Sequence, residues 1–137
     1  MIEVIALSIP GDPRTQKRHR DGKYGGKYDP SAESKRTFLD LAYEHKPEKP
    51  FNQPICVKIN FYFSRPKSHF GTGKNADNLK DSAPIWCDKK PDIDNIQKFV
   101  YDSFKGVFWT DDSLICRNEN IKQYSNNPRT EISIFTL

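Results

Sequence analysis

The segment from Ile55 to Phe63 constrains the fold more than any other part of the sequence, because its apolar residues recur at every second position. One side of the segment is wholly apolar: Ile55, Val57, Ile59, Phe61 and Phe63. The other side is mixed: Cys56, Lys58, Asn60 and Tyr62. A period of two is that of a β-strand, in which successive side chains point to opposite faces of the sheet. The segment therefore predicts a strand with one face in the hydrophobic core.

Three further segments are predicted as strands. Met1 to Ile9 is rich in isoleucine and valine and ends at the turn-forming residues Pro10 to Pro13. Alternation is irregular from about Ser113 to Tyr124, which indicates a strand with a bulge. It is regular from Thr130 to Thr136, and the intervening residues Ser125 to Pro128 are a strong turn signal. We expect these last two strands to pair as an antiparallel hairpin.

Two segments are predicted as helices. The first opens at Asp29-Pro30, a favourable cap followed by a first-turn proline, and runs to about His45. Its expected apolar side is Ala32, Leu39, Ala42 and Tyr43, and its expected polar side is Lys35 and Arg36. The second helix runs from about Ile93 to Lys105, between Pro91 and Gly106. Its apolar residues recur at helical spacing: Ile96, Val100, Phe104 and Val107.

A chain of 137 residues is expected to form one domain, spanning residues 1–137. We therefore predict an α/β fold of the α+β type, a single domain with a mixed β-sheet of about four strands, two main helices and long basic loops. Four aromatic residues are candidates for the core or for an interface, and the sequence does not separate the two: Phe61, Phe63, Phe108 and Trp109.

The segment from Lys90 to Lys98 has the sequence K-P-D-I-D-N-I-Q-K and places two carboxylates at the predicted helix start. Asp94 and Lys98 are four residues apart and therefore share a helix face. Mg2+ binds carboxylate oxygens, usually one or two of them together with water and substrate phosphate. The pattern fits metal-dependent phosphoryl chemistry. It also fits a structural interpretation, in which Asp92 caps the helix and Asp94 forms a surface ion pair with Lys98.

This segment and the downstream Asp111-Asp112-Ser113 resemble the two motifs of the RusA-type Holliday junction resolvases. These phage and prophage endonucleases have a K-P-D-x-D-N-x-x-K segment, followed after a helix by D-D-S. The resemblance implies a RusA-like fold and a Mg2+-dependent endodeoxyribonuclease, with Mn2+ as an alternative ion. It also implies resolution of four-way DNA junctions by paired symmetric nicks, in recombination and repair. Only residues 90–113 match closely enough to assign roles.

By this resemblance, Asp92, Asp94 and Asp112 would bind the metal and Lys98 would assist catalysis. Asp111 would be a further metal ligand, a turn residue or a hydrogen-bond partner of a ligand. Leu114 departs from the family, in which a glutamine often follows D-D-S. Because a four-way junction has two-fold symmetry, the activity implies a homodimer with two matching sites.

Cationic residues are concentrated in two long loops, and the net charge is +4. Those predicted to contact DNA are Arg14, Lys17, Arg18, Arg20, Lys23, Lys27, Lys67, Lys74, Lys89 and Lys90. Tyr24 and Tyr28 are candidates for stacking on an exposed base. The first loop also fits a solvated, mobile insertion. In the second, from Arg65 to Lys90, we expect one helical turn between Asp77 and Asp81, and Trp86-Cys87 as an anchor.

No apolar run is long enough to span a membrane, and the N-terminus lacks a secretory pattern, so we expect a cytoplasmic protein without a membrane partner. The three cysteines are widely separated and lack zinc-site spacing with the histidines, which argues against structural zinc and a disulfide framework. No small-molecule cofactor is expected.

Two other functions stay open. One is a non-catalytic nucleic-acid-binding module whose aspartates cap helices and turns, although uncompensated carboxylates would repel a polyanion. The other is a small metal-dependent nuclease for flaps, forks or single strands, because the sequence does not show the shape of its substrate.

Overall fold

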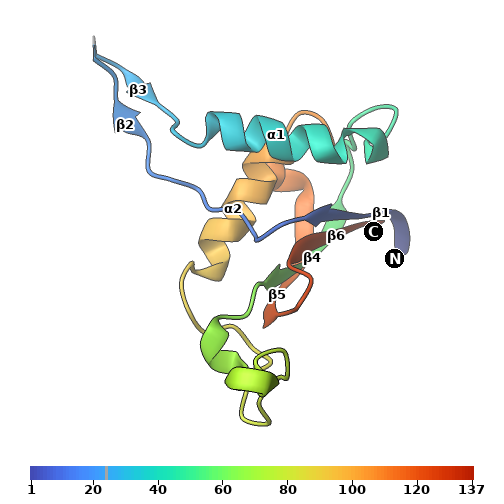
Figure 1. Cartoon of the computed structure of the whole chain (residues 1–137). Helices are drawn as coiled ribbons and strands as arrows, with labels where there is room; N and C mark the ends of the chain where they lie inside the picture. The colour runs from blue at the N-terminus through green and yellow to red at the C-terminus, as the bar shows by residue number, and fades with distance from the viewer. Residues whose placement is uncertain (24) are drawn as a thin grey trace.

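A four-stranded mixed β-sheet is the centre of the structure, a computed structural model that describes residues 1–23 and 25–137. Its strands are β1 (Ile2–Pro10), β6 (Arg129–Thr136), β4 (Ile55–Phe63) and β5 (Ile115–Tyr124), in that spatial order. Strand β6 is antiparallel to both β1 and β4, whereas β4 and β5 are parallel. Helices α1 (Ala32–Ala42) and α2 (Ile93–Phe104) pack on one face of this sheet (Figure 1). The predicted α+β fold with four strands and two helices is confirmed.

The hydrophobic core lies between the two helices and that face of the sheet. Strand β4 lies inside the sheet, and Ile55, Val57, Ile59 and Phe61 are buried on the predicted side. Three of the four aromatic candidates belong to the core, namely Phe61, Phe108 and Trp109, and Phe63 packs against it. The sequence pattern of this strand therefore predicted its core face correctly.

The expected hairpin between β5 and β6 is wrong, because β4 lies between these two strands. The connection after β5 passes the end of β4, where the amide of Ser125 donates to the carbonyl oxygen of Phe63 at 2.9 Å. Strand β5 pairs with β4 in parallel, an arrangement that requires a long crossover, and α2 lies within that crossover. The predicted bulge is present, since the register passes from Ile115 directly to Arg117.

Helix α1 is shorter than predicted, and its buried face differs. It starts at Ala32 and ends at Ala42, and a 3-10 turn at Tyr43–His45 follows it. The buried residues are Phe38 and Ala42, whereas Ala32 and Tyr43 are exposed. The prediction failed because Phe38, in the middle of the helix, contacts Phe99 and Phe104 of α2 and so determines which face is buried.

Helix α2 agrees closely with its prediction. Asp92 occupies the N-cap position, and the helix begins at Ile93. At the other end Gly106 has a φ of +87°, a left-handed conformation that favours glycine and ends the helix. The buried residues of α2 are Ile96, Phe99, Val100, Ser103 and Phe104. The polar residues around Asp94 are thereby left on the side away from the core.

The second basic loop contains two 3-10 turns, at Lys67–His69 and Gly73–Asn75. The helical turn expected between Asp77 and Asp81 is therefore wrong, since the turn lies a few residues earlier. Near the end of the loop, the amide of Tyr124 donates to the carbonyl oxygen of Ile85 at 2.9 Å. Cys87 is buried, but the Trp86 side chain is 58% exposed. Backbone pairing with β5 and the Cys87 side chain anchor the loop, and the indole ring does not.

The first basic loop forms a short hairpin that projects from the body of the molecule (Figure 1). Its strands are β2 (Arg20–Asp21) and β3 (Lys27–Tyr28), both fully exposed. The stacking role expected for Tyr24 concerns a residue outside the described part of the chain, and Tyr28 is exposed. In the described ranges, no helix is long and apolar enough to cross a membrane.

Candidate active site

The two aspartates of the K-P-D-I-D-N segment lie at the N-terminal end of α2. Asp92 is the N-cap residue and Asp94 belongs to the first turn, and both are exposed. Lys98 follows one turn later and is also exposed. Carboxylates are favoured at this end of a helix because the helix dipole is positive there. Over the described residues, no ion pair joins Asp94 to Lys98, so both side chains are available to a ligand.

The backbone just before Asp92 is held from strand β5 by Lys122. Its Nζ atom donates to the carbonyl oxygens of Lys89 and Pro91, each at 2.6 Å. Such charge-assisted bonds are stronger than neutral ones. Lys122 therefore fixes the entry of the chain into the acidic segment. The sequence contained no signal for this role, because it depends on the position of β5 beside α2.

Polar side chains join α2 to β5. Asn118 donates to Gln97 Oε1 at 2.9 Å and to the hydroxyl of Tyr101 at 3.2 Å. Asn120 also donates to Gln97. These bonds hold the middle turn of α2, from Gln97 to Tyr101, to β5.

Asp112 lies near the C-terminal half of α2, whereas Asp92 and Asp94 lie at its N-terminal end. Its Oδ1 accepts a hydrogen bond of 2.8 Å from Trp109 Nε1, and the Trp109 ring packs edge-on against Tyr101 at 5.6 Å. Tyr101 is about two helical turns after Asp94. Burial, with a smaller contribution from the charge of Asp112, raises the pKa of Tyr101. Asp112 thus lies beside the C-terminal half of α2.

Asp111 caps the 3-10 turn Asp112–Leu114. Its Oδ2 accepts from the amide of Ser113 at 3.0 Å, and its Oδ1 lies 3.3 Å from Lys105 Nζ. Hydrogen bonds from Ser113, and then from Lys105, lower the pKa of Asp111 to about 2. Leu114, which departs from the expected motif, packs against the core.

Asp92 and Asp94 fit a hard divalent cation, because two exposed carboxylates with water and phosphate are a common Mg2+ environment. Within residues 1–23 and 25–137, no group of three His, Cys, Asp or Glu side chains is close enough to hold a metal ion. Among the described residues, the structure therefore does not gather Asp92, Asp94, Asp111 and Asp112 into one metal-binding group. The assignment of all four aspartates as ligands stays a prediction.

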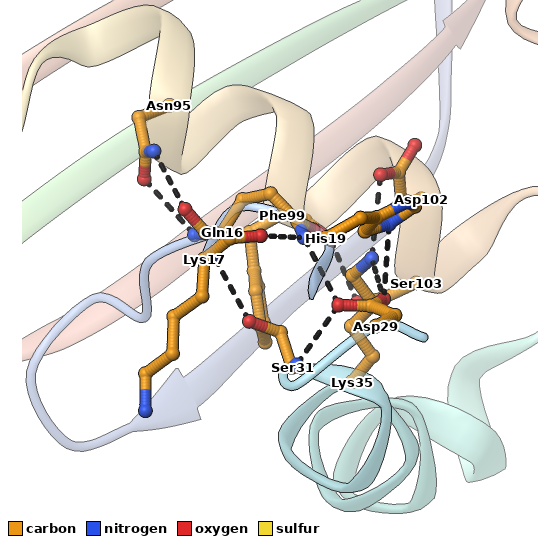
Figure 2. Close-up of polar contacts among 10 residues, drawn as sticks. All are labelled: Gln16, Lys17, His19, Asp29, Ser31, Lys35, Asn95, Phe99, Asp102 and Ser103. Atoms are coloured by element: carbon orange, nitrogen blue, oxygen red, sulfur yellow. Dashed lines mark hydrogen bonds and ion pairs between the residues drawn. The ribbon is translucent and has the colours of Figure 1, made fainter. Parts of the chain in front are cut away.

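Asn95, the residue after Asp94, joins α2 to the first basic loop. Its Oδ1 accepts from the amide of Gln16 at 2.9 Å, and its Nδ2 donates to the carbonyl oxygen of Gln16 at 2.8 Å (Figure 2). One side chain thus satisfies both backbone groups of a residue 79 positions away. The prediction missed Gln16, because nothing in the sequence marks this long-range contact.

The two ends of that loop are also held to α1 and to each other (Figure 2). The amide of Lys17 donates to Ser31 Oγ at 2.9 Å, and Gln16 Nε2 donates to Asp29 Oδ1 at 3.2 Å. Lys35 lies 2.6 Å from Asp29 and 3.4 Å from Asp102 of α2. We call residues 17–28, between these held ends, the basic arm.

Asp29 is the most connected carboxylate of this network. Burial raises its pKa, but hydrogen bonds outweigh that effect and lower the pKa from 3.8 to about 2. The largest of these bonds comes from Lys35, followed by the Ser31 amide and Gln16. Asp29 therefore stays ionised over the whole physiological range.

Two hollows lie on either side of the Asn95–Gln16 contact. One, of about 480 Å³, is lined by Thr15, Gln16, Lys90, Pro91, Asp92 and Asn95. The other, of about 320 Å³, is lined by Gln16, Lys17, Arg18, His19, Asn95, Lys98 and Asp102. Asp92 and Lys90 line the first hollow, and Lys98, Lys17 and Arg18 line the second.

The predicted DNA-binding cations fall into three places. Those exposed in the basic arm are Lys17, Arg18, Arg20, Lys23 and Lys27. Those exposed in other parts of the chain are Lys67, Lys74, Lys89 and Lys90. Lys89 and Lys90 adjoin the acidic segment, whereas Lys67 and Lys74 lie on the 3-10 turns of the second loop. Arg14 differs, because its guanidinium lies over the Phe38 ring at 5.4 Å and its Nη1 atom is buried, with no hydrogen-bond partner among the described residues. Burial lowers the pKa of Arg14.

Comparison with known proteins identifies a family. The family model described as endodeoxyribonuclease RusA matches residues 10–135. A protein of Bacillus subtilis (strain 168), described as uncharacterized protein YqaN, is 28% identical over 138 residues. That alignment covers 97% of this chain and 96% of the relative, so the likeness extends over the whole fold.

Proposed function

The chain belongs to the RusA endodeoxyribonuclease family, and we propose that it is a metal-dependent nuclease that resolves four-way DNA junctions in recombination and repair. Family membership implies endodeoxyribonuclease activity. The dependence on a metal, the branched substrate and the residue roles below are the proposal.

The observation that supports the proposal most directly is the join between the acidic segment and a cationic arm. Asp92 and Asp94 are exposed at the start of α2, and the next residue, Asn95, binds the root of the arm. Exposed carboxylates without a cation repel a DNA backbone, so placing them beside an arm rich in lysine and arginine suits an enzyme that binds both DNA and a metal.

Asp92 and Asp94 would hold a Mg2+ or Mn2+ ion, with Asp112 and Asp111 as the further ligands predicted from the family motif. When bound there, the ion would polarise the scissile phosphate and lower the pKa of a coordinated water. Lys98, exposed one turn after Asp94, would stabilise negative charge that develops on the phosphate. The hydrogen bond from Asn120 to Gln97 would hold α2 against β5 while the DNA backbone lies along the exposed face of the helix.

The exposed lysines and arginines would bind DNA phosphates and release counterions. Of these residues, Lys17 and Arg18 line one hollow and Lys90 lines the other. Lys67 and Lys74 would contact a neighbouring duplex arm. Because a four-way junction has two-fold symmetry, we propose that the active form is a homodimer with one site for each of two opposed strands.

The test is a cleavage assay on a synthetic mobile four-way junction, with matched duplex, flap and single-stranded DNA as controls, in Mg2+ and in EDTA. The proposal predicts paired symmetric nicks on the junction alone and only with the metal. Equal cleavage of all the DNAs would show a general nuclease. Tight binding without cleavage would favour the non-catalytic binding module, an alternative supported by the lack of a three-carboxylate group in the described residues.

A further inference from the structure

We infer that Asn95 is a positioning residue that sets the direction of the basic arm relative to the acidic pair, so that DNA bound by the arm passes over Asp92, Asp94 and Lys98. The inference rests on the proposed function. It assigns a role to the asparagine of the K-P-D-I-D-N segment that is separate from metal binding and from phosphate binding.

The bonding of Asn95 is specific to an amide side chain. An asparagine supplies one acceptor and one donor, and here both are used on the amide and the carbonyl of the same residue, Gln16. An aspartate lacks the donor, and an alanine lacks both groups. Because Asn95 binds only backbone atoms of Gln16 in these two bonds, the side chain of Gln16 can change without loss of this contact.

Among the described residues of the basic arm, most of the contacts beyond its ends lie within the arm itself. Beyond its held ends, the bonds of the arm are largely internal, such as Gly22 to Gly26 at 2.7 Å and the pairing of Arg20 with Tyr28. The hairpin projects away from the helices and the sheet (Figure 1). The direction of the arm is therefore set at its two ends. Asn95 binds one end to α2, and the Asp29–Lys35 ion pair binds the other end to α1.

Asn95 lines both hollows and directly follows Asp94 in the chain. Loss of its contact with Gln16 would therefore shift the arm relative to Asp92 and Asp94. Phosphate contacts made by the arm do not depend on this alignment, since they need only exposed cations. Alignment of a scissile phosphate does depend on it, because misplacement of the order of 1 Å costs about 100-fold in rate. Binding and cleavage should therefore respond differently to the loss of Asn95.

The experiment compares Asn95→Ala with Asn126→Ala, which removes the amide of an exposed turn residue elsewhere. Each variant is measured for affinity to a four-way junction in EDTA and for its single-turnover rate with Mg2+. Positions of the nicks are mapped to the nucleotide. Limited digestion with trypsin reports how accessible the arm is, because the arm contains trypsin sites at Lys17, Arg18, Arg20, Lys23 and Lys27.

For Asn95→Ala we expect affinity within about threefold of the unchanged protein, a rate lower by about 10- to 100-fold, nicks spread over more positions and faster trypsin cleavage in the arm. The Asn126→Ala control should behave like the unchanged protein. An unchanged rate and unchanged nick positions would overturn the inference, as would a lower rate with an arm no more accessible to trypsin.

Should Asn95→Ala fail to fold, Gln16→Pro tests the same contact from the other side, since proline lacks the donor amide and α2 is left intact. The same split between affinity and rate is expected, and its absence would overturn the inference. If the unchanged protein cleaves no DNA, the proposed function fails. The trypsin and affinity measurements then still decide whether Asn95 holds the arm.

Discussion

Lys122 of β5 donates a hydrogen bond of 2.6 Å to the carbonyl oxygen of Pro91, the residue immediately before the first aspartate of the acidic segment. A second bond of 2.6 Å goes to the carbonyl oxygen of Lys89. An edge strand of the sheet thus holds the loop that presents the proposed metal ligands. The ammonium group of Lys122 also places a positive charge next to that loop.

Replacement of this lysine by methionine, Lys122→Met, should loosen the acidic segment while keeping the apolar part of the side chain. Hydrogen bonds to charged groups contribute about 1.5–3 kcal/mol each, so we expect a loss of about 2 kcal/mol in the free energy of unfolding, measured with urea. The single-turnover cleavage rate should fall by about tenfold. Lys58→Met is the matched control, because Lys58 lies in β4 and holds no loop among the described residues: it pairs with Glu119 at 3.8 Å and lies over the Phe135 ring at 5.3 Å. Equal effects of the two variants would contradict the assigned role.

Neutralising either acid of the pair, by Asp92→Asn or Asp94→Asn, should abolish metal-dependent cleavage. Junction binding should be kept or become tighter, because a negative charge near the phosphates is removed. Gel-shift titration in EDTA and cleavage in Mg2+ measure the two properties separately. Asp81→Asn, at an exposed loop position, is the control and should cleave normally. Loss of binding together with cleavage would indicate misfolding and remove support for a ligand role.

Removal of the lysine one turn later, by Lys98→Ala, should lower the maximal rate by about 100-fold and change the affinity little. Lys98 is exposed in the hollow that also contains Arg18 and His19, so its loss creates no cavity in the core. Lys49→Ala, in the linker after α1, serves as a control for the loss of one positive charge. A Lys98 variant with an unchanged rate would exclude this residue from the mechanism.

The salt dependence of binding should separate Arg14 from the arginines of the arm. Arg18→Gln and Arg20→Gln should each reduce the slope of log affinity against log salt by about one unit, because each removes one phosphate contact. Arg14→Gln should leave the slope unchanged and lower stability, since its guanidinium packs on Phe38. Binding titrations at four or more salt concentrations measure the slopes. A slope that changes with Arg14 alone would reverse this assignment.

Acid should release the root of the basic arm. The pKa of Asp29 is lowered to about 2 in the folded protein, so its ionised form stabilises the fold. That contribution is complete above the unfolded pKa of about 4 and is lost as the pH falls toward about 2. Trypsin is inactive in this range, so pepsin digestion of the arm or hydrogen exchange between pH 5 and pH 2 is the measurement. Asp29→Asn should remove most of this pH dependence.

Local features of the sequence predicted the elements that carry the site. The cap position of Asp92, the start of α2 and its end at Gly106 follow from side-chain and backbone preferences within a few residues. The strict alternation in β4 predicted its buried face because burial on one side of a strand imposes a period of two. The acidic segment itself was visible as a motif, and the family match over residues 10–135 agrees with the resemblance drawn from it.

Contacts between distant residues were decided by the tertiary structure. The sequence favoured a β5–β6 hairpin because the turn between them is strong, but β4, whose apolar face is buried in the core, pairs with both strands and lies between them. Likewise Phe38, and not the sequence pattern of α1, determined which face is buried. The Asn95–Gln16 contact, the support from Lys122 and the burial of Arg14 all join segments far apart in the chain. Local preferences act over a few residues, whereas these contacts exist only once the sheet and helices have packed.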